Sequence, residues 1–129
     1  ANNILDGGIG GKDILTGQGG ADTFAFSSRP RSFRKYQADH ITDFSSAEGD
    51  KIQISKSSFG ITGEATLSVV SGRSAVKGAL STASMFIYDT SIGELHWNQN
   101  GTRIGDGIGG VLAVLDNNAT LSASDLMLI

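Results

Sequence analysis

Two blocks of sequence, GIGGKDIL at residues 8–15 and GQGGADTF at residues 17–24, repeat one pattern at a spacing of nine. In both blocks glycine fills the first, third and fourth places, aspartate the sixth, and a bulky apolar residue the eighth. A fragment of a third block lies ten residues ahead, with Asn3 in the place of the aspartate and Leu5 in that of the apolar residue. A flexible glycine-rich linker has no reason to repeat an aspartate and an apolar residue in register. We therefore interpret the stretch as a structural repeat.

The residue types of this repeat suit a site for a hard cation. Glycines tolerate positive φ, so the backbone can bend tightly and turn several carbonyl oxygens toward one point. Ca²⁺ takes six to eight oxygen ligands from carboxylates, carbonyls and water. One turn with its aspartate supplies half of such a shell, and a second turn stacked on it can supply the rest. The apolar residue two places after each aspartate then points inward from a short strand, which predicts a stacked parallel coil.

The blocks resemble the nonapeptide calcium-binding repeat of RTX proteins, Gly-Gly-x-Gly-x-Asp-x-apolar-x. They depart from it at Ile9 and Gln18, which stand where the second glycine is usual. The resemblance covers about the first 26 residues, and so few repeats are typical of the tail of a longer array. It implies that Ca²⁺ is the cofactor and that a parallel β-roll is the local fold.

A second resemblance lies just beyond the repeats. Asp43-Phe44 followed by GDKI at residues 49–52 is similar to the segment that begins the cap on the roll in serralysin-type secreted proteases and other RTX proteins. In that family a carboxylate near the start of this segment can complete the last calcium shell. The resemblance implies this role for Asp39, and for Asp43 as the second candidate. Asp43 is equally well explained as a turn-initiating residue that binds its own backbone.

The expected calcium ligands therefore fall into three groups. Carboxylates come from the two repeat aspartates and from the segment that replaces the missing next turn, and carbonyls come from the turn glycines. Asn3 would offer a neutral oxygen at the edge of the array. The full set is Asp13, Asp22 and Asp39 with Gly8, Gly10, Gly17 and Gly19.

Length and composition narrow the class of protein. The chain has 129 residues, a formal net charge of −3 and no cysteine. The length fits one domain or two small subdomains, and the mild negative charge argues against a broad nucleic-acid footprint. No apolar run reaches the eighteen or so residues of a membrane span, and no signal-peptide pattern opens the chain. Without disulfides, an extracellular protein needs another staple, and calcium would serve.

The rest of the chain alternates as strands do. Phe24 and Phe26 share one face of a strand over residues 22–26. Residues 85–89 and 94–98 bracket a short connection that contains Gly93, which predicts a hairpin. Further strands are expected at residues 66–70, 111–115 and 126–129, with one brief helix over residues 77–84.

The last five residues, DLMLI at 125–129, place an acidic residue before four apolar ones. Several proteins exported by bacterial type I secretion end in this way, and the downstream segments at 98–102 and 121–125 also resemble the C-terminal part of RTX proteins. The same five residues fit a last strand of the sheet, and the two interpretations are compatible.

A basic segment separates the repeats from the cap. It holds the only proline and the side chains Arg29, Arg31, Arg34 and Lys35. We interpret it as a solvated loop whose charge offsets nearby carboxylates. The alternative is a contact for an acidic polysaccharide, which would make the chain a calcium-dependent carbohydrate-binding module of an extracellular polysaccharide-modifying enzyme.

Other motifs carry little chemistry. GDGIGG at residues 105–110 matches a dinucleotide fingerprint in letters, but a strand rather than a helix is expected after it. His40 and His96 are the only histidines, and neither an H-E-x-x-H nor a G-x-S-x-G motif is present. Trp97 is expected in the core rather than on a sugar ring. Asn98 and Asn100 lack the charge of a calcium loop and favour a turn.

The sequence thus predicts an all-β fold in which a short parallel β-roll is capped by a mostly antiparallel β-sandwich. Residues 1–26 form the roll stub, and residues 27–129 form the cap with the C-terminal export signal. The expected role is that of a calcium-binding RTX end module of a secreted, extracellular bacterial protein. No catalytic site is expected here, and any catalytic domain would lie upstream. Without calcium, Asp6, Asp13 and Asp22 would crowd a glycine-rich strip with little core to gain.

Overall fold

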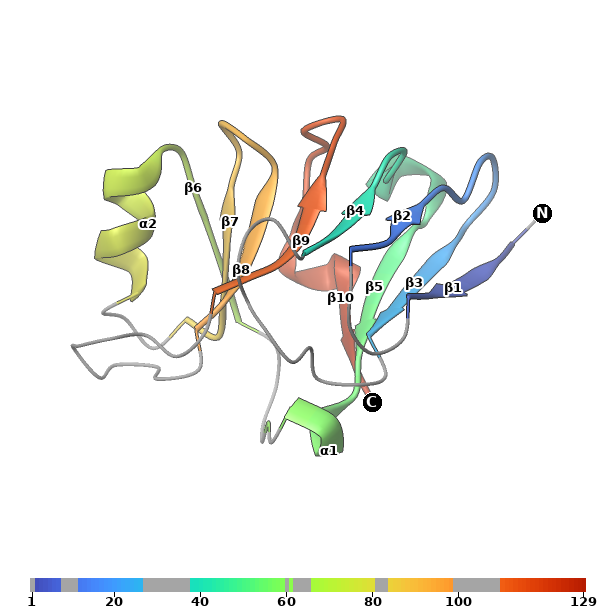
Figure 1. Cartoon of the computed structure of the whole chain (residues 1–129), viewed down its shortest axis with the longest axis horizontal. Helices are drawn as coiled ribbons and strands as arrows, with labels where there is room; N and C mark the ends of the chain where they lie inside the picture. The colour runs from blue at the N-terminus through green and yellow to red at the C-terminus, as the bar shows by residue number, and fades with distance from the viewer. Residues whose placement is uncertain are drawn as a thin grey trace.

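The computed structural model of the chain describes residues 2–7, 12–26, 38–59, 61, 66–80, 84–98 and 110–129, and among these residues strand is far more common than helix (Figure 1). The strands are β1 (Ile4–Asp6), β2 (Ile14–Leu15), β3 (Thr23–Phe26), β4 (Asp39–Ile41), β5 (Lys51–Ile54), β6 (Leu67–Val70), β7 (Phe86–Asp89), β8 (Glu94–Trp97), β9 (Gly110–Leu115) and β10 (Leu126–Leu128). The helices are α1 (Lys56–Phe59) and α2 (Arg73–Leu80), with 3₁₀ turns at Ser46–Glu48 and Ala123–Asp125.

The strands form two sheets. One has the order β1-β3-β5-β10, and every neighbouring pair in it is parallel. The other has the order β2-β4-β9-β8-β7-β6. In this second sheet β2, β4 and β9 are parallel to one another and β6 is parallel to β7, whereas β8 is antiparallel to both of its neighbours.

The first five strands alternate between the two sheets along the chain. β1, β3 and β5 lie in the first sheet, while β2 and β4 lie in the second. Each connection between consecutive strands therefore crosses from one sheet to the other. In Figure 1 the connections β2–β3 and β4–β5 lie next to each other at the top of the molecule. This alternation stacks each turn on the turn that comes two connections later.

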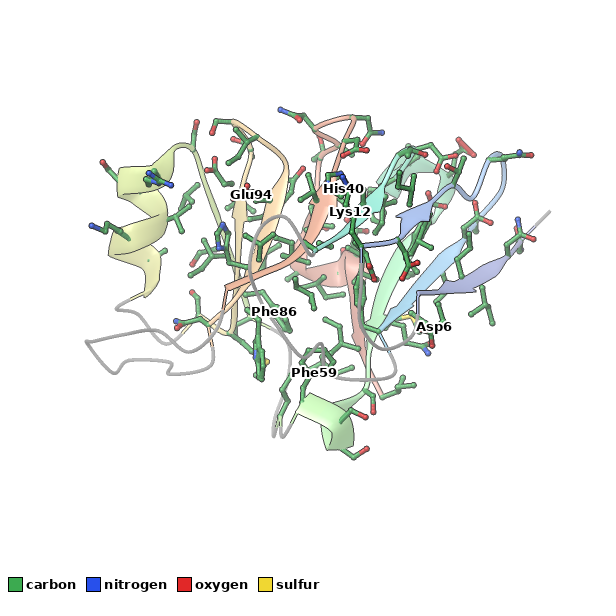
Figure 2. The ribbon with its side chains drawn as sticks, in the orientation of Figure 1. Asp6, Lys12, His40, Phe59, Phe86 and Glu94 are labelled. Carbon is green, nitrogen blue, oxygen red and sulfur yellow. The ribbon has the colours of Figure 1, made fainter. Side chains whose placement is uncertain are left out.

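The main core lies between the two sheets, and its buried side chains come from strands of both. β5 shows the period of two of a strand with one buried face: Ile52 and Ile54 are fully buried, and Lys51 and Gln53 are half-buried. Phe24 packs against Phe44 with ring centroids 6.2 Å apart. Phe59 of α1, which Figure 2 shows at the lower end of the molecule, meets Trp97 edge-on with ring centroids 5.0 Å apart. The core location predicted for Phe24, Phe26 and Trp97 is confirmed.

Most of the strands expected downstream are present. The hairpin is β7–β8, the buried strand is β9, and the last strand is β10. The cap, however, is not mostly antiparallel. The pairs β4–β9, β5–β10 and β6–β7 are parallel, because the chain leaves and re-enters each sheet in the same direction.

Two further expectations need correction or qualification. The helix predicted at residues 77–84 is α2 at Arg73–Leu80, and its last three predicted residues before Ser84 lie outside the described ranges. The short helix α1 has no counterpart in the sequence-based prediction.

Both sheets contain strands from each side of residue 26, where the expected roll stub ends and the expected cap begins, since β3 pairs with β5 and β2 with β4. Within the described ranges, no helix is long and apolar enough to cross a membrane.

Candidate metal centre

The strand register places the two repeat aspartates in separate stacks, Asp22 just before β3 in the first sheet and Asp13 just before β2 in the second. In the first sheet, Asn3 lies just before β1, Asp22 just before β3 and Asp50 just before β5, and the register makes them neighbours in that order. The amide of Asn3 donates to Asp22 Oδ1 at 2.8 Å, and the amide of Asp22 donates to Asp50 Oδ1 at 2.8 Å. On the opposite edge the amide of Asp13 donates to Asp39 Oδ1 at 2.9 Å. At Asp22 and Asp39 the ladder bond occupies one carboxylate oxygen and leaves the second available, whereas the second oxygen of Asp50 accepts from the amide of Ser45 at 2.8 Å.

On the edge that holds Asp13 and Asp39, the second oxygens converge on Gly7. A Cβ placed on Gly7 would lie 2.7 Å from Asp39 Oδ2 and 2.8 Å from Asp13 Oδ2. Two anionic oxygens therefore approach one point of the backbone that only a glycine leaves open. Asp39 thus lies beside the repeat aspartate Asp13, and its role as a calcium ligand stays a prediction.

The electrostatics of this edge point the same way. Partial burial raises the pKa of Asp39, and the carboxylates of Asp13 and Asp6 raise it further. The hydrogen bond from the Asp13 amide and the proximity of His40 lower it by less. Since both burial and like charge disfavour the ionised form, a cation at this position would relieve the strain.

On the other edge the decisive group is Asp22. Its side chain is only 1% exposed, and its Oδ2 has no hydrogen-bond donor among the described residues. This oxygen faces Gly17, where a Cβ would lie 2.3 Å away. The side-chain amide of Asn3 donates to the carbonyl of Gly17 at 3.1 Å, which ties the residue before β1 to the same turn. A buried carboxylate oxygen without a donor is costly, and a bound cation is the partner that such an oxygen fits.

Side chains alone do not complete either shell. In the described part of the chain no three His, Cys, Asp or Glu side chains gather as metal ligands. A cation held here would therefore need backbone carbonyls and water besides the carboxylates, as a hard ion accepts. Of the glycines expected to provide them, Gly17 and Gly19 lie in the turn before Asp22, whereas Gly8 and Gly10 lie outside the described ranges.

Two acidic side chains at this turn, Asp43 and Glu48, were not anticipated in the role they play. Asp43 accepts from the amides of Gly17 at 3.0 Å and Gln18 at 2.6 Å, and Glu48 accepts from the amide of Gly20 at 3.0 Å. Asp43 thus binds the backbone of another turn instead of its own. The offset of 26 residues between Gly17 and Asp43 equals that between Ile14 and His40 in the β2–β4 pair, so this contact follows from a register that only the structure reveals.

The remaining candidates are accounted for by other contacts. His40 Nδ1 lies 2.5 Å from Asp116 Oδ1, and His96 Nε2 lies 3.4 Å from Glu94 Oε1. The two histidines therefore belong to separate ion pairs on β4 and β8. The strand β9 follows the GDGIGG motif, as expected for a sequence that is not a dinucleotide fingerprint. The basic side chains Arg29, Arg31, Arg34 and Lys35 lie outside the described residues.

Two sheets joined by stacked glycine turns that carry aspartates define a mostly β protein. A family model described as "Peptidase M10 serralysin C terminal" matches residues 1–106, and the chain belongs to this family. The domain that defines the family is the non-catalytic C-terminal part of serralysin-type proteases. Neither the curated proteins nor the solved structures contain a significant match to the chain. The family predicted from the repeats is thereby confirmed.

Proposed function

We propose that this chain is a calcium-binding RTX module that folds when Ca²⁺ binds. The observation that carries the proposal is the pair of unfinished carboxylate shells at opposite edges of the stacked turns. On one edge the second oxygens of Asp13 and Asp39 converge on Gly7, and on the other edge Asp22 Oδ2 is buried without a donor.

The donor chemistry favours calcium over other biological cations. The chain has no cysteine, and the two histidines are paired with carboxylates elsewhere, so soft or borderline metals find no sulfur or nitrogen ligands at these turns. Flexible backbone oxygens and carboxylates suit the irregular shell of Ca²⁺ better than the strict octahedron of Mg²⁺.

Calcium binding and folding should be coupled because the turns connect the strands. β3 starts directly after Asp22, and β4 starts at Asp39. Without the cation, bringing these carboxylates together costs electrostatic and desolvation free energy. Binding therefore supplies free energy for folding. In this proposal residues 1–26 are the first coils of a parallel β-roll, a view supported by the alternation of β1 to β5 between two sheets.

The family supports a setting for this switch. Serralysin C-terminal domains belong to secreted bacterial proteases, which leave a calcium-poor cytoplasm for a calcium-rich exterior. We infer that the chain passes unfolded through a type I exporter that reads its C-terminal residues 125–129, and folds outside the cell. Its role is then physical, and any catalysis belongs to an upstream domain.

A calcium titration followed by far-UV circular dichroism tests the proposal. The wild-type chain should gain β signal as calcium rises into the range of about 10⁻⁴–10⁻³ M that extracellular modules use. Asp13→Asn and Asp22→Asn should need at least about tenfold more calcium, since each loses a charged ligand. Asparagine keeps a side-chain oxygen, so the comparison isolates the charge.

Asp116→Asn is the matched control, because it neutralises a carboxylate that contacts His40 outside the glycine turns. Its calcium midpoint should stay within about twofold of wild type. A wild-type chain with the same β signal in chelator and in calcium would refute the coupling of binding to folding. Magnesium at equal concentration should give little of the response.

A further inference from the structure

The turn at residues 17–22 is covered by the turn at residues 42–50. The β2–β4 pairing continues past the ends of the strands, where the amide of Thr42 donates to the Leu15 carbonyl at 3.0 Å and the hydroxyls of Thr16 and Thr42 lie 2.6 Å apart. The next pair in this register is Gly17 and Asp43. The two turns therefore meet at the top of the molecule in Figure 1.

The contact between the turns consists of backbone amides on one side and carboxylates on the other. Four amides of residues 17–22 donate to the side chains of Asp43, Glu48 and Asp50 at 2.6–3.0 Å. A fifth amide, that of Ala21, donates to Asn2 Oδ1 at 2.9 Å. Bonds of this kind to an ionised acceptor are stronger than those between neutral groups.

Gln18 is the strained residue of this turn. It has a φ of 67°, in the left-handed region, at the place where the RTX repeat usually has glycine. For a residue with a Cβ this conformation costs roughly 1–2 kcal/mol. Its amide makes the shortest of the bonds to the downstream turn, 2.6 Å to Asp43 Oδ2.

The geometry points to Asp43 as the positioning residue of the Asp22 cation site: its two carboxylate oxygens hold Gly17 and Gln18 so that the strained turn keeps its shape around Asp22. The second oxygen of Asp43 binds the amide of Gly17, and Gly17 is the residue against which Asp22 Oδ2 lies. Asp43 thereby compensates for the missing glycine at position 18. This inference rests on the calcium-binding function proposed above.

A double-mutant cycle tests whether Asp43 acts through Gln18. Asp43→Asn removes the charge and turns one acceptor into a donor, so the calcium concentration at the folding midpoint should rise about tenfold. Gln18→Gly removes the strain but gives the unfolded chain more conformational freedom, and because the two effects are of similar size the midpoint should stay within about twofold. In the double variant the penalty of Asp43→Asn should shrink to about threefold or less.

Glu48→Gln is the matched control, because Glu48 holds Gly20 rather than Gln18. It should raise the midpoint by about threefold whether residue 18 is glutamine or glycine. An equal penalty of Asp43→Asn in both backgrounds would overturn the inference, as would a rescue of Glu48→Gln by Gln18→Gly. If Asp43→Asn does not fold at any calcium concentration, the double variant must fold, and its failure would also overturn the inference.

The cycle separates this inference from the proposed function. If the wild-type chain folds without calcium, the proposed function fails, and the coupling of Asp43 to Gln18 can still be measured as a free energy of unfolding in urea. If calcium drives folding but the coupling is absent, only the role of Asp43 is wrong.

Discussion

Tyr88 on β7 combines full burial with a polar group that must find a partner. Its hydroxyl donates to the carbonyl of Ala119 at 2.5 Å, which ties β7 to the segment before β10. Burial raises the pKa of Tyr88 to about 12, and the neighbouring negative charge of Asp89 also raises this pKa. The phenol is therefore a neutral donor throughout the physiological range.

This raised pKa predicts a loss of stability in alkali. The unfolded phenol ionises near pH 10 and the folded one near pH 12. Stability is therefore complete below about pH 10 and falls as the pH rises to about 12, by roughly 2–3 kcal/mol over this window. Urea unfolding at a series of pH values measures the fall.

Tyr88→Phe provides the reference for this measurement. It should be less stable at pH 7 by about 1–2 kcal/mol, because the Ala119 carbonyl loses its donor. Between pH 10 and 12 its stability should fall less steeply than that of wild type. Parallel curves for the two proteins would show that Tyr88 does not set the alkaline limit.

Single residues also show how far the sequence alone could go at the site. The repeat spacing pointed to Asp13 and Asp22, and the family resemblance pointed to Asp39. All three lie at the edges where carboxylate oxygens remain available. The role of Asp43 was missed, since its partners Gly17 and Gln18 are 25–26 residues away and become neighbours only through the β2–β4 register.

At the scale of elements, two glycines fill opposite roles. Gly93 closes the β7–β8 hairpin at a φ of +71°, and a Cβ there would lie 2.2 Å from the carbonyl of Leu115. The amide of Leu115 in turn donates to the carbonyl of Gly93 at 2.7 Å. Gly78 lies inside α2, and a Cβ there would have no contact within 4 Å. Only the first position requires glycine.

Alanine at each position should therefore move stability in opposite directions. Gly93→Ala combines a strained φ with a clash against backbone and should cost about 2–4 kcal/mol. Gly78→Ala should stabilise the protein by about 0.5–1 kcal/mol, since alanine is the better helix former. Thermal unfolding in saturating calcium gives both values, and a neutral Gly93→Ala would contradict the packing of β9 against the hairpin.

The position of α2 shows why element boundaries escaped the sequence. The helix begins after Gly72, whose φ is +98° and whose amide is held by Asp89 Oδ1 at 2.9 Å. Its apolar face is formed by Val76 and Ala79, which pack on Ile87 of β7. The start of the helix is thus set by a strand that follows it in the chain, and local propensity carries no information about that contact.

At the scale of the whole molecule, the C-terminal strand β10 belongs to the same sheet as β1, β3 and β5, the strands that follow Asn3, Asp22 and Asp50. β10 pairs with β5, and β5 pairs with β3, which follows Asp22. Asp125, just before β10, is buried and accepts from the hydroxyl of Ser46 at 2.9 Å, while Lys51 Nζ lies 3.7 Å from it. Because the sheet is continuous, a loss of packing at β10 should destabilise β5 and β3 as well, and with them the proposed calcium site at Asp22.

Two neighbouring residues of β10 test this coupling. Leu126 is 6% exposed, whereas Met127 is 37% exposed. Leu126→Ala should cost about 2–4 kcal/mol and raise the calcium concentration needed for folding. Met127→Ala should change stability by about 1 kcal/mol or less and leave the calcium midpoint nearly unchanged. Equal midpoints for wild type and Leu126→Ala would mean that the two ends of the sheet fold independently.

The sequence by itself determined the family, the strand-rich class and the aspartates at the turn edges, because these depend on short-range patterns: a nine-residue spacing, alternation of apolar residues, and glycine before an acid. The tertiary structure decided the rest. It set the parallel pairings of the cap, the start of α2 and the clamp that Asp43 places on Gln18. Each of these depends on which distant strands are neighbours, and the free energy that selects those neighbours comes from burying side chains between two sheets.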